Sequence, residues 1–142
     1  MIFRLKSGAD ISESITEFCT VNKIKSGLVL FIGAVSEFTI GYYDQSKKKY
    51  KKMSVKKPME IASGIGNISL KDNKPFFHGH ISLSDRYGKM TGGHLFSPTR
   101  VFACEAAILT GKKALSRQYD DQTGLFLWKF GACGRLKTMY EK

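Results

Sequence analysis

One segment near the start of the chain carries apolar residues at helical spacing. Ile11, Ile15, Phe18 and Cys19 recur three or four residues apart, which places them on one face of a helix. Asp10 precedes them, and aspartate is favoured as an N-cap because its carboxylate accepts a hydrogen bond from a free backbone N–H of the first turn. The pattern predicts a helix from about residue 10 to residue 22.

The rest of the chain is typical of strands, with alternating apolar and polar positions and many β-branched and aromatic residues. A short polar loop, Lys71 to Lys74, separates two of these segments and is typical of a hairpin. The predicted strands are Ile2–Lys6, Leu28–Ile32, Ala34–Asp44, Tyr50–Val55, Met59–Leu70, Pro75–Leu83, Met90–Phe96, Arg100–Thr110 and Leu125–Phe130. We therefore predict an α+β fold, a mostly antiparallel sheet with one N-terminal helix packed on a face.

The length of 142 residues suits one domain with a full core, so we expect a single domain over residues 1–142. The N-terminus turns polar after Lys6, with no apolar signal core behind it. The longest apolar stretch, Gly27 to Val35, is about half of what a membrane-spanning helix needs. The sequence predicts a cytoplasmic protein that does not enter the membrane.

The cysteines, Cys19, Cys104 and Cys133, are odd in number and far apart in the sequence. They have neither the spacing of a zinc-binding pair nor the density of a secreted disulfide scaffold. We expect buried free thiols, because an unpaired cysteine usually packs as a small apolar residue.

Charge changes this picture, because 23 Lys+Arg against 12 Asp+Glu leave a net charge of +11. Much of the excess lies in one short segment, in which the lysines are Lys47, Lys48, Lys49, Lys51, Lys52, Lys56 and Lys57. Such a segment could contact the phosphates of DNA, together with Arg86 and Arg100. The alternative is a solvated hairpin whose lysines keep a sheet edge from pairing with other chains.

All three histidines lie in two glycine-containing segments, Phe77-His78-Gly79-His80 and Thr91-Gly92-Gly93-His94. Side chains two residues apart in a strand share a face, so His78 and His80 can converge, and His94 can join them from a neighbouring strand. Three neutral imidazoles suit zinc or another divalent first-row ion and leave a position for an outside ligand. The alternative is strand-end histidines that bond to carbonyls or solvent.

A metal-dependent enzyme would need a further acidic group, for which Glu105 and Glu60 are the candidates as a fourth ligand or a base. Glu105 has another reading, because a carboxylate in an apolar strand can pair with a buried cation at a subunit contact. The sequence contains no Ser-His-Asp order, phosphate-binding Walker loop or dinucleotide fingerprint. The sequence therefore leaves an enzymatic function undecided and favours a protein that is not an enzyme.

Several blocks together resemble one known family, the plant and prokaryote conserved (PPC) domain. The blocks run in the same order and spacing from about residue 2 to residue 130. They are Gly33-Ala34-Val35-Ser36, Ile40-Gly41-Tyr42-Tyr43-Asp44, Met59-Glu60-Ile61, Gly66-Asn67-Ile68-Ser69, Pro75-Phe76-Phe77-His78-Gly79-His80-Ile81-Ser82-Leu83 and Gly92-Gly93-His94-Leu95. The resemblance is to the stand-alone prokaryotic form.

The resemblance implies a homotrimer of α+β subunits and a DNA-binding role. Exposed apolar strands around Leu28 to Val35 and Val101 to Leu109 would be buried between the subunits. It also implies a metal site at His78, His80 and His94. The chain departs from the plant members, because it lacks an Arg-Gly-Arg hook for the minor groove and keeps only Glu60-Ile61 of the plant Gly-Arg-Phe-Glu-Ile-Leu block.

Two classes of function follow. The first is a DNA-binding or regulatory module that uses the lysines on phosphates and carries a three-histidine metal site, with zinc as the expected ion. The second is a metal-dependent enzyme or a small-ligand-binding protein. The sequence contains no device for reading base edges, so any DNA binding should be weak in sequence preference and steep in salt dependence.

Overall fold

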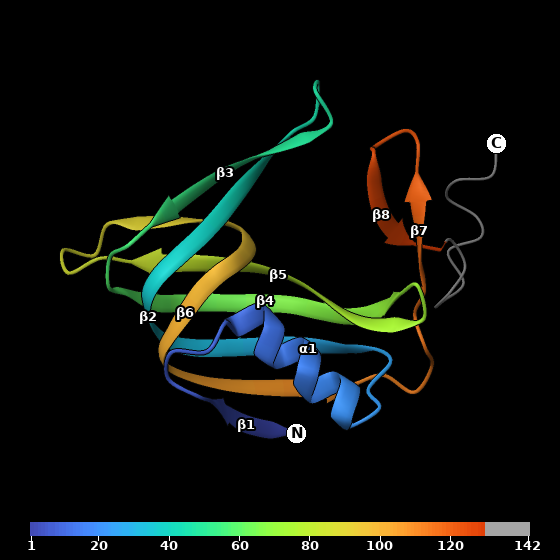
Figure 1. Ribbon diagram of the computed structural model, residues 1–142, viewed down its shortest axis with the longest axis horizontal. Helices are drawn as coiled ribbons and strands as arrows, with labels where there is room; N and C mark the ends of the chain where they lie inside the picture. The colour runs from blue at the N-terminus through green and yellow to red at the C-terminus, as the bar shows by residue number, and fades with distance from the viewer. Residues whose placement is uncertain (130–142) are drawn as a thin grey trace.

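The structure is a computed structural model that describes residues 1–129 (Figure 1). The described elements, in chain order, are β1 (Ile2–Leu5), α1 (Ile11–Val21), β2 (Gly27–Asp44), β3 (Lys49–Val55), β4 (Met59–Lys71), β5 (Lys74–Ser84), β6 (Met90–Thr110), β7 (Arg117–Asp120) and β8 (Leu125–Trp128). The predicted α+β class is confirmed, since one short helix accompanies a mostly antiparallel sheet. No helix of the described residues is long and apolar enough to cross a membrane.

The main sheet has six antiparallel strands in the order β1-β6-β5-β4-β2-β3. The long strands β2 and β6 also pair with each other, so β6 contacts β5 near one of its ends and β2 along most of its length. β7 and β8 form a separate two-stranded hairpin near the turn between β4 and β5 (Figure 1). The pairing of β6 with both strands curves the sheet and brings distant segments together.

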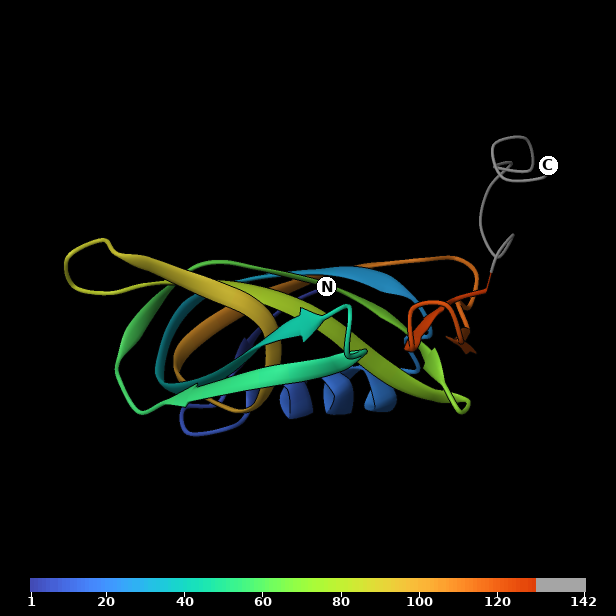
Figure 2. The same ribbon diagram turned by 90° about the horizontal axis from the view of Figure 1, so that it is seen from above.

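Helix α1 covers one face of the sheet, as the view from above shows (Figure 2). Its side chains Ile11, Ile15 and Cys19 are buried against the sheet, as their spacing predicts. Asp10 caps the helix, because its carboxylate accepts a hydrogen bond of 3.0 Å from the backbone N–H of Glu13. The same carboxylate accepts bonds from the Ser97 hydroxyl at 2.8 Å and the Thr99 N–H at 2.7 Å, which ties the helix start to β6.

Two pairs of predicted strands are each one continuous strand. The predicted break at Gly33 is a bulge inside β2, where Gly33 has a φ of +141° and the register shifts against β4. A Cβ at this position would overlap the backbone oxygen of Ala103, so only glycine fits. The predicted break between Phe96 and Arg100 is an irregular stretch inside β6, and β6 pairs with β2 on both sides of it.

The far end of the chain was predicted only in part. The strand expected at Leu125–Phe130 is β8, with Phe130 outside the described residues, and its partner β7 was not predicted. Cys19 and Cys104 are buried free thiols, as expected, and burial raises the pKa of each to about 11. Cys133 lies outside the described residues.

The sheet face opposite α1 carries an exposed apolar patch. It lies on neighbouring strands, since Leu30 of β2 is aligned with Ala107 of β6 and with Ile65 of β4. Members of this patch are Leu28, Leu30, Ile32, Ile65 and Leu109, which are 40% to 64% exposed. On the same face, Ile65 is aligned with His80 of β5, so the patch continues directly into the histidines.

Candidate metal centre

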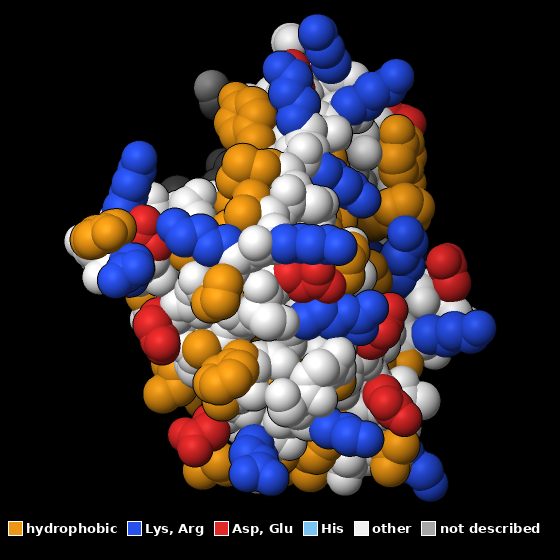
Figure 3. Space-filling model, turned by 60° about the vertical axis from the view of Figure 1, so that its left-hand side comes forward, with side chains coloured by type: hydrophobic (Ala, Val, Ile, Leu, Met, Phe, Trp, Pro, Cys, Tyr) orange, Lys and Arg blue, Asp and Glu red, His pale blue; other side chains and the backbone are white. Residues whose placement is uncertain are grey.

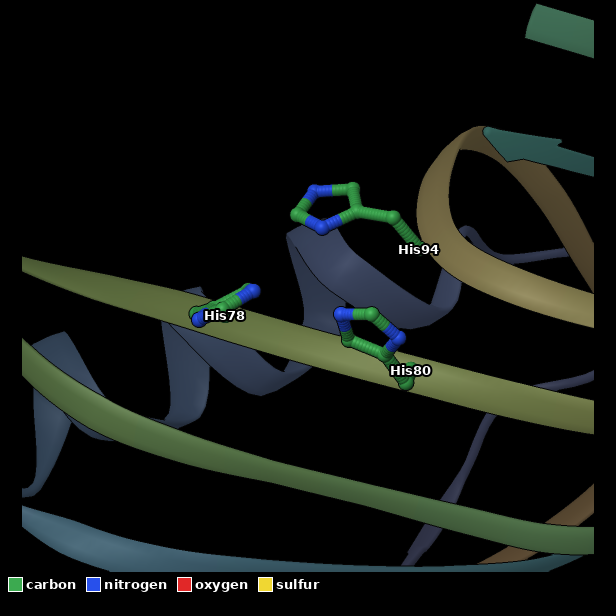
Figure 4. A group of neighbouring side chains, drawn as sticks. All are labelled: His78, His80 and His94. Carbon is green, nitrogen blue, oxygen red and sulfur yellow. The ribbon is translucent and has the colours of Figure 1, made fainter. Parts of the chain in front are cut away.

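The sheet register places the three histidines side by side. His78 and His80 are on the outer face of β5, because the alternate residues Phe77, Gly79 and Ile81 point into the core. His94 of β6 is aligned directly with His80. All three side chains therefore project from the same outer face, and they point towards one another in Figure 4.

The distances suit a single ion. One ligand atom from each histidine lies within 4.8 Å of the others, and the ring centroids are 4.9 to 5.4 Å apart. Zinc–nitrogen bonds of 2.0–2.1 Å at a tetrahedral angle place ligand atoms about 3.4 Å apart. Small side-chain rotations would close this difference, so the donor set fits a tetrahedral ion with three protein ligands.

The protonation states also suit a metal. Burial lowers the pKa of His78 to about 4, with smaller contributions from the charges of Arg117 and His80. Burial likewise lowers the pKa of His94 to about 4, helped by the other two histidines, Lys52 and Arg117. Both rings are neutral at pH 7, which is the form that binds a metal.

Two aromatic side chains hold His94 in place. The Tyr50 hydroxyl lies 3.3 Å from His94 Nδ1, and its ring centroid is 4.8 Å from that of His94. The Phe96 ring is 4.6 Å away from the His94 ring. These contacts restrict the rotamer of His94, and a preset ligand loses less entropy when it binds an ion.

Arg117 of β7 was missed by the sequence analysis. Its NH2 group lies 3.5 Å from His78 Nδ1 and donates a hydrogen bond of 2.8 Å to Asn67 of β4. Asn67 is aligned with His78 in the sheet and belongs to one of the sequence blocks, so its polar side chain on a strand was a usable signal. Arg117 had no such signal, because it reaches the site from a separate hairpin.

The two carboxylates that the sequence suggested do not join the histidines. Glu60 is aligned with Ser84, four residues along β5 from His80, and Glu105 lies eleven residues along β6 from His94. Neither belongs to the group of potential ligands found among residues 1–129. Glu105 is exposed beside Ile32 on the apolar face, so within one chain the fold does not bring either carboxylate to the histidines. The sequence could not show this, because strand periodicity gives the face but not the distance along the sheet.

The predicted phosphate-binding lysines gather on and beside the projecting β2–β3 hairpin (Figure 3). All seven of them are exposed: Lys47, Lys48, Lys49, Lys51, Lys52, Lys56 and Lys57. Two of them form ion pairs within the chain: Lys51 with Asp44 and Lys57 with Asp85, each at 3.2 Å. The other candidates belong to other segments: Arg100 of β6 pairs with Glu37 at 3.6 Å, and the guanidinium of Arg86, between β5 and β6, lies over the Tyr87 ring.

A sequence model of the Plants and Prokaryotes Conserved (PCC) domain matches residues 1–112. No curated protein matches the chain by sequence.

Solved structures resemble it closely. A metal-containing protein from Archaeoglobus fulgidus is 46% identical, with 91% of each chain covered and a TM-score of 0.86. A PPC protein from Pyrococcus horikoshii is 35% identical, covering 91% of this chain and 90% of its own, at a TM-score of 0.85. A candidate DNA-binding protein from Bacteroides thetaiotaomicron is 28% identical, with 91% and 90% covered and a TM-score of 0.86.

Proposed function

Because the chain belongs to the Plants and Prokaryotes Conserved domain family, we propose that it is a metal-binding member of that family, with a divalent ion held by His78, His80 and His94. The convergence of these three side chains within 4.8 Å carries the proposal. The metal-containing relative from Archaeoglobus fulgidus supports it. Zinc is the proposed ion, because it accepts three imidazoles in a tetrahedral site and leaves one position for an outside ligand.

Elemental analysis of protein purified without a histidine tag tests the metal site. We expect close to one equivalent of zinc per chain in the wild type and less than a tenth of that in His78→Ala, His80→Ala or His94→Ala. The matched control is Lys74→Ala, an exposed change on the same strand, which should keep the metal. Wild-type protein that neither contains nor takes up a divalent transition metal would refute the proposal, as would full metal content in the histidine variants.

The basic hairpin supports a second function, the binding of DNA phosphates. Its seven lysines are exposed, and candidate DNA-binding proteins are among the structural relatives. Each phosphate that a lysine neutralises adds about 0.9 to the slope of log affinity against log salt concentration. We therefore propose that the protein binds DNA without sequence preference and with a steep dependence on salt. We also propose a cytoplasmic location.

Fluorescence anisotropy over a salt series tests the DNA proposal. One variant replaces five hairpin lysines with serine: Lys47, Lys48, Lys49, Lys51 and Lys52. A control variant of equal charge replaces five exposed lysines elsewhere: Lys6, Lys25, Lys74, Lys89 and Lys112. The hairpin variant should lose affinity equally for AT-rich and GC-rich duplexes, with a slope smaller by about 3 to 5. Equal losses in both variants would show that net charge alone, rather than the hairpin, attracts DNA.

The exposed apolar patch supports assembly into a homotrimer. Apolar faces of this kind usually contact another protein, and Leu30 and Ile32 lie in the patch with 43% and 58% of their surface exposed. Light scattering should give the mass of three chains for the wild type and of one chain for Leu30→Lys. A monomeric wild type at micromolar concentration would refute the trimer.

A further inference from the structure

Positive charge surrounds the histidine group on two sides. Arg117 NH2 lies 3.5 Å from His78 Nδ1. On the other side, Lys52 Nζ lies 4.1 Å from the centre of the Phe96 ring, which contacts His94. A divalent ion would add to this charge, so the open coordination position faces an environment that favours an anionic ligand.

Arg117 is held in a fixed orientation by neutral groups. Its Nε donates to the Ser69 hydroxyl at 2.7 Å, its NH1 to the Phe126 carbonyl at 2.7 Å, and its NH2 to the Asn67 side-chain oxygen at 2.8 Å. None of these acceptors is charged, and no ion pair within residues 1–129 involves Arg117. The guanidinium charge is therefore not neutralised locally, although the side chain is half-buried.

The hairpin that carries Arg117 is itself anchored to the rest of the site. The Tyr43 hydroxyl donates to the Thr123 carbonyl at 2.7 Å, and Lys48 Nζ donates to the Asp121 carbonyl at 2.7 Å. Both acceptors lie in the turn between β7 and β8, while both donors belong to the β2–β3 hairpin. The two hairpins therefore hold Arg117 and Tyr50 on either side of the histidines.

A guanidinium has five N–H donors, and in Arg117 three of them donate short hydrogen bonds to protein oxygens. The N–H groups that remain, beside His78 of the proposed metal site, suit an acceptor with two oxygens on one centre. Arginine recognises carboxylates and phosphates in this way, through parallel hydrogen bonds. A metal also accepts such an oxygen as a ligand, so both groups would bind the same molecule.

We propose that Arg117 and the metal on His78, His80 and His94 together form a binding site for a small oxyanion, either a carboxylate or a phosphate. This inference rests on the proposed metal site and names the class of its ligand. Arg117 lies beyond residues 1–112, which the family model matches.

The test uses full-length protein loaded with cobalt(II), whose visible spectrum reports the ligands of the metal. Acetate, inorganic phosphate and neutral acetamide are titrated separately, and calorimetry measures each affinity. Acetate and acetamide have nearly the same shape, so their comparison isolates the negative charge in the wild-type protein. Comparison of the affinities for acetate and phosphate shows which oxyanion the site prefers.

Arg117→Met removes the charge, Arg117→Lys keeps it without the planar fork, and Arg86→Met is the matched control at an exposed arginine. We expect Arg117→Met to bind cobalt within threefold of wild type but to lose at least tenfold in oxyanion affinity. Arg117→Lys should be intermediate, and Arg86→Met unchanged. Acetamide should neither bind measurably nor alter the spectrum.

Oxyanion affinity that survives in Arg117→Met, or acetamide binding equal to acetate binding, would overturn the inference while leaving the metal site intact. Failure of the wild type to bind cobalt would refute the metal site, and the inference with it. If Arg117→Met proves unfolded by circular dichroism, the acetate–acetamide comparison in the wild type and the Arg117→Lys affinity decide the question.

Discussion

Replacing Asp10 with alanine should remove a large share of the stability of this fold. The carboxylate is 3% exposed and accepts three hydrogen bonds, from the Glu13 N–H, the Ser97 hydroxyl and the Thr99 N–H. It joins the start of α1 to the irregular part of β6, which begins three residues after His94. Alanine would remove all three acceptor contacts at once.

The size of the loss follows from these contacts. Loss of an N-cap costs about 1 kcal/mol. Each of the other two bonds to a charged acceptor contributes about 1.5 kcal/mol, and the Thr99 N–H would be left buried without a partner. The free energy of unfolding should therefore fall by about 4 kcal/mol, out of about 5–15 kcal/mol for a typical domain. Ser97→Ala removes one of these bonds and should cost about 1.5 kcal/mol.

Urea unfolding followed by circular dichroism, at one protein concentration, measures this change. Asp85→Ala is the control, because the Asp85 carboxylate also accepts three bonds, from the backbone N–H groups of Tyr87 and Lys89 and from Lys57 Nζ, but all three are exposed and water can replace them. We expect only a small fraction of the Asp10 effect there. A loss below about 1.5 kcal/mol in Asp10→Ala would refute the reasoning, since it would mean that water or a shifted backbone satisfies the freed donors.

Three further predictions concern the core and the site. Gly33→Ala should cost more than about 2 kcal/mol or prevent folding, because its Cβ would overlap the Ala103 oxygen, whereas Gly8→Ala meets no neighbour and should cost about 1 kcal/mol. In a Cys133→Ser background the two buried thiols, with pKa values of about 11, should react with a disulfide reagent at pH 8 only when the protein is denatured. Metal-free protein should lose stability as the pH falls from about 6.5 towards 4. His78 and His94 have a pKa of about 4 in the folded chain, so over this pH range they take up protons in the unfolded chain and favour unfolding. The thermal midpoint of His78→Gln should fall less steeply with pH than that of the wild type.

Elements set by local chemistry could be predicted from the sequence. The helix follows from one cap and one apolar stripe, and the β4–β5 hairpin from its polar turn. Asp72 and Asn73 adopt φ values of +51° and +60° in this turn, a conformation that Asp and Asn tolerate better than most residues. Such signals are complete within a few residues, so no knowledge of the tertiary fold is needed.

The continuity of the long strands could not be predicted, because a bulge and a strand end have the same local signature. Gly33 could end a strand or interrupt it. In the structure β2 continues, since β4 and β6 pair with it on both sides of the bulge. The local sequence is compatible with either a strand end or a bulge, and long-range pairing decides between them.

The histidines could be predicted as a group because face and strand order were enough to bring them together. Arg117 could not, since a hairpin of two short strands carries it to the site from outside the main sheet. Its position depends on a backbone hydrogen bond of 2.6 Å from the Leu70 N–H of β4 to the Leu115 carbonyl, and on side-chain contacts between that hairpin and the β2–β3 hairpin. No periodicity in the sequence records contacts of this kind.

The two proposed functions meet at Lys52, which belongs to the basic hairpin and also lies near the metal ligands. Its Nζ contacts Phe96, which in turn contacts His94. These contacts keep Lys52 within about 9 Å of the His94 ring, close to the Debye length of about 8 Å at physiological salt. At about this separation the charge of a bound ion is partly screened, so it would change the binding of a phosphate at Lys52 by about a few tenths of a kcal/mol. A larger effect of metal on DNA affinity would require the ion to reposition the hairpin through Tyr50, which contacts His94 directly.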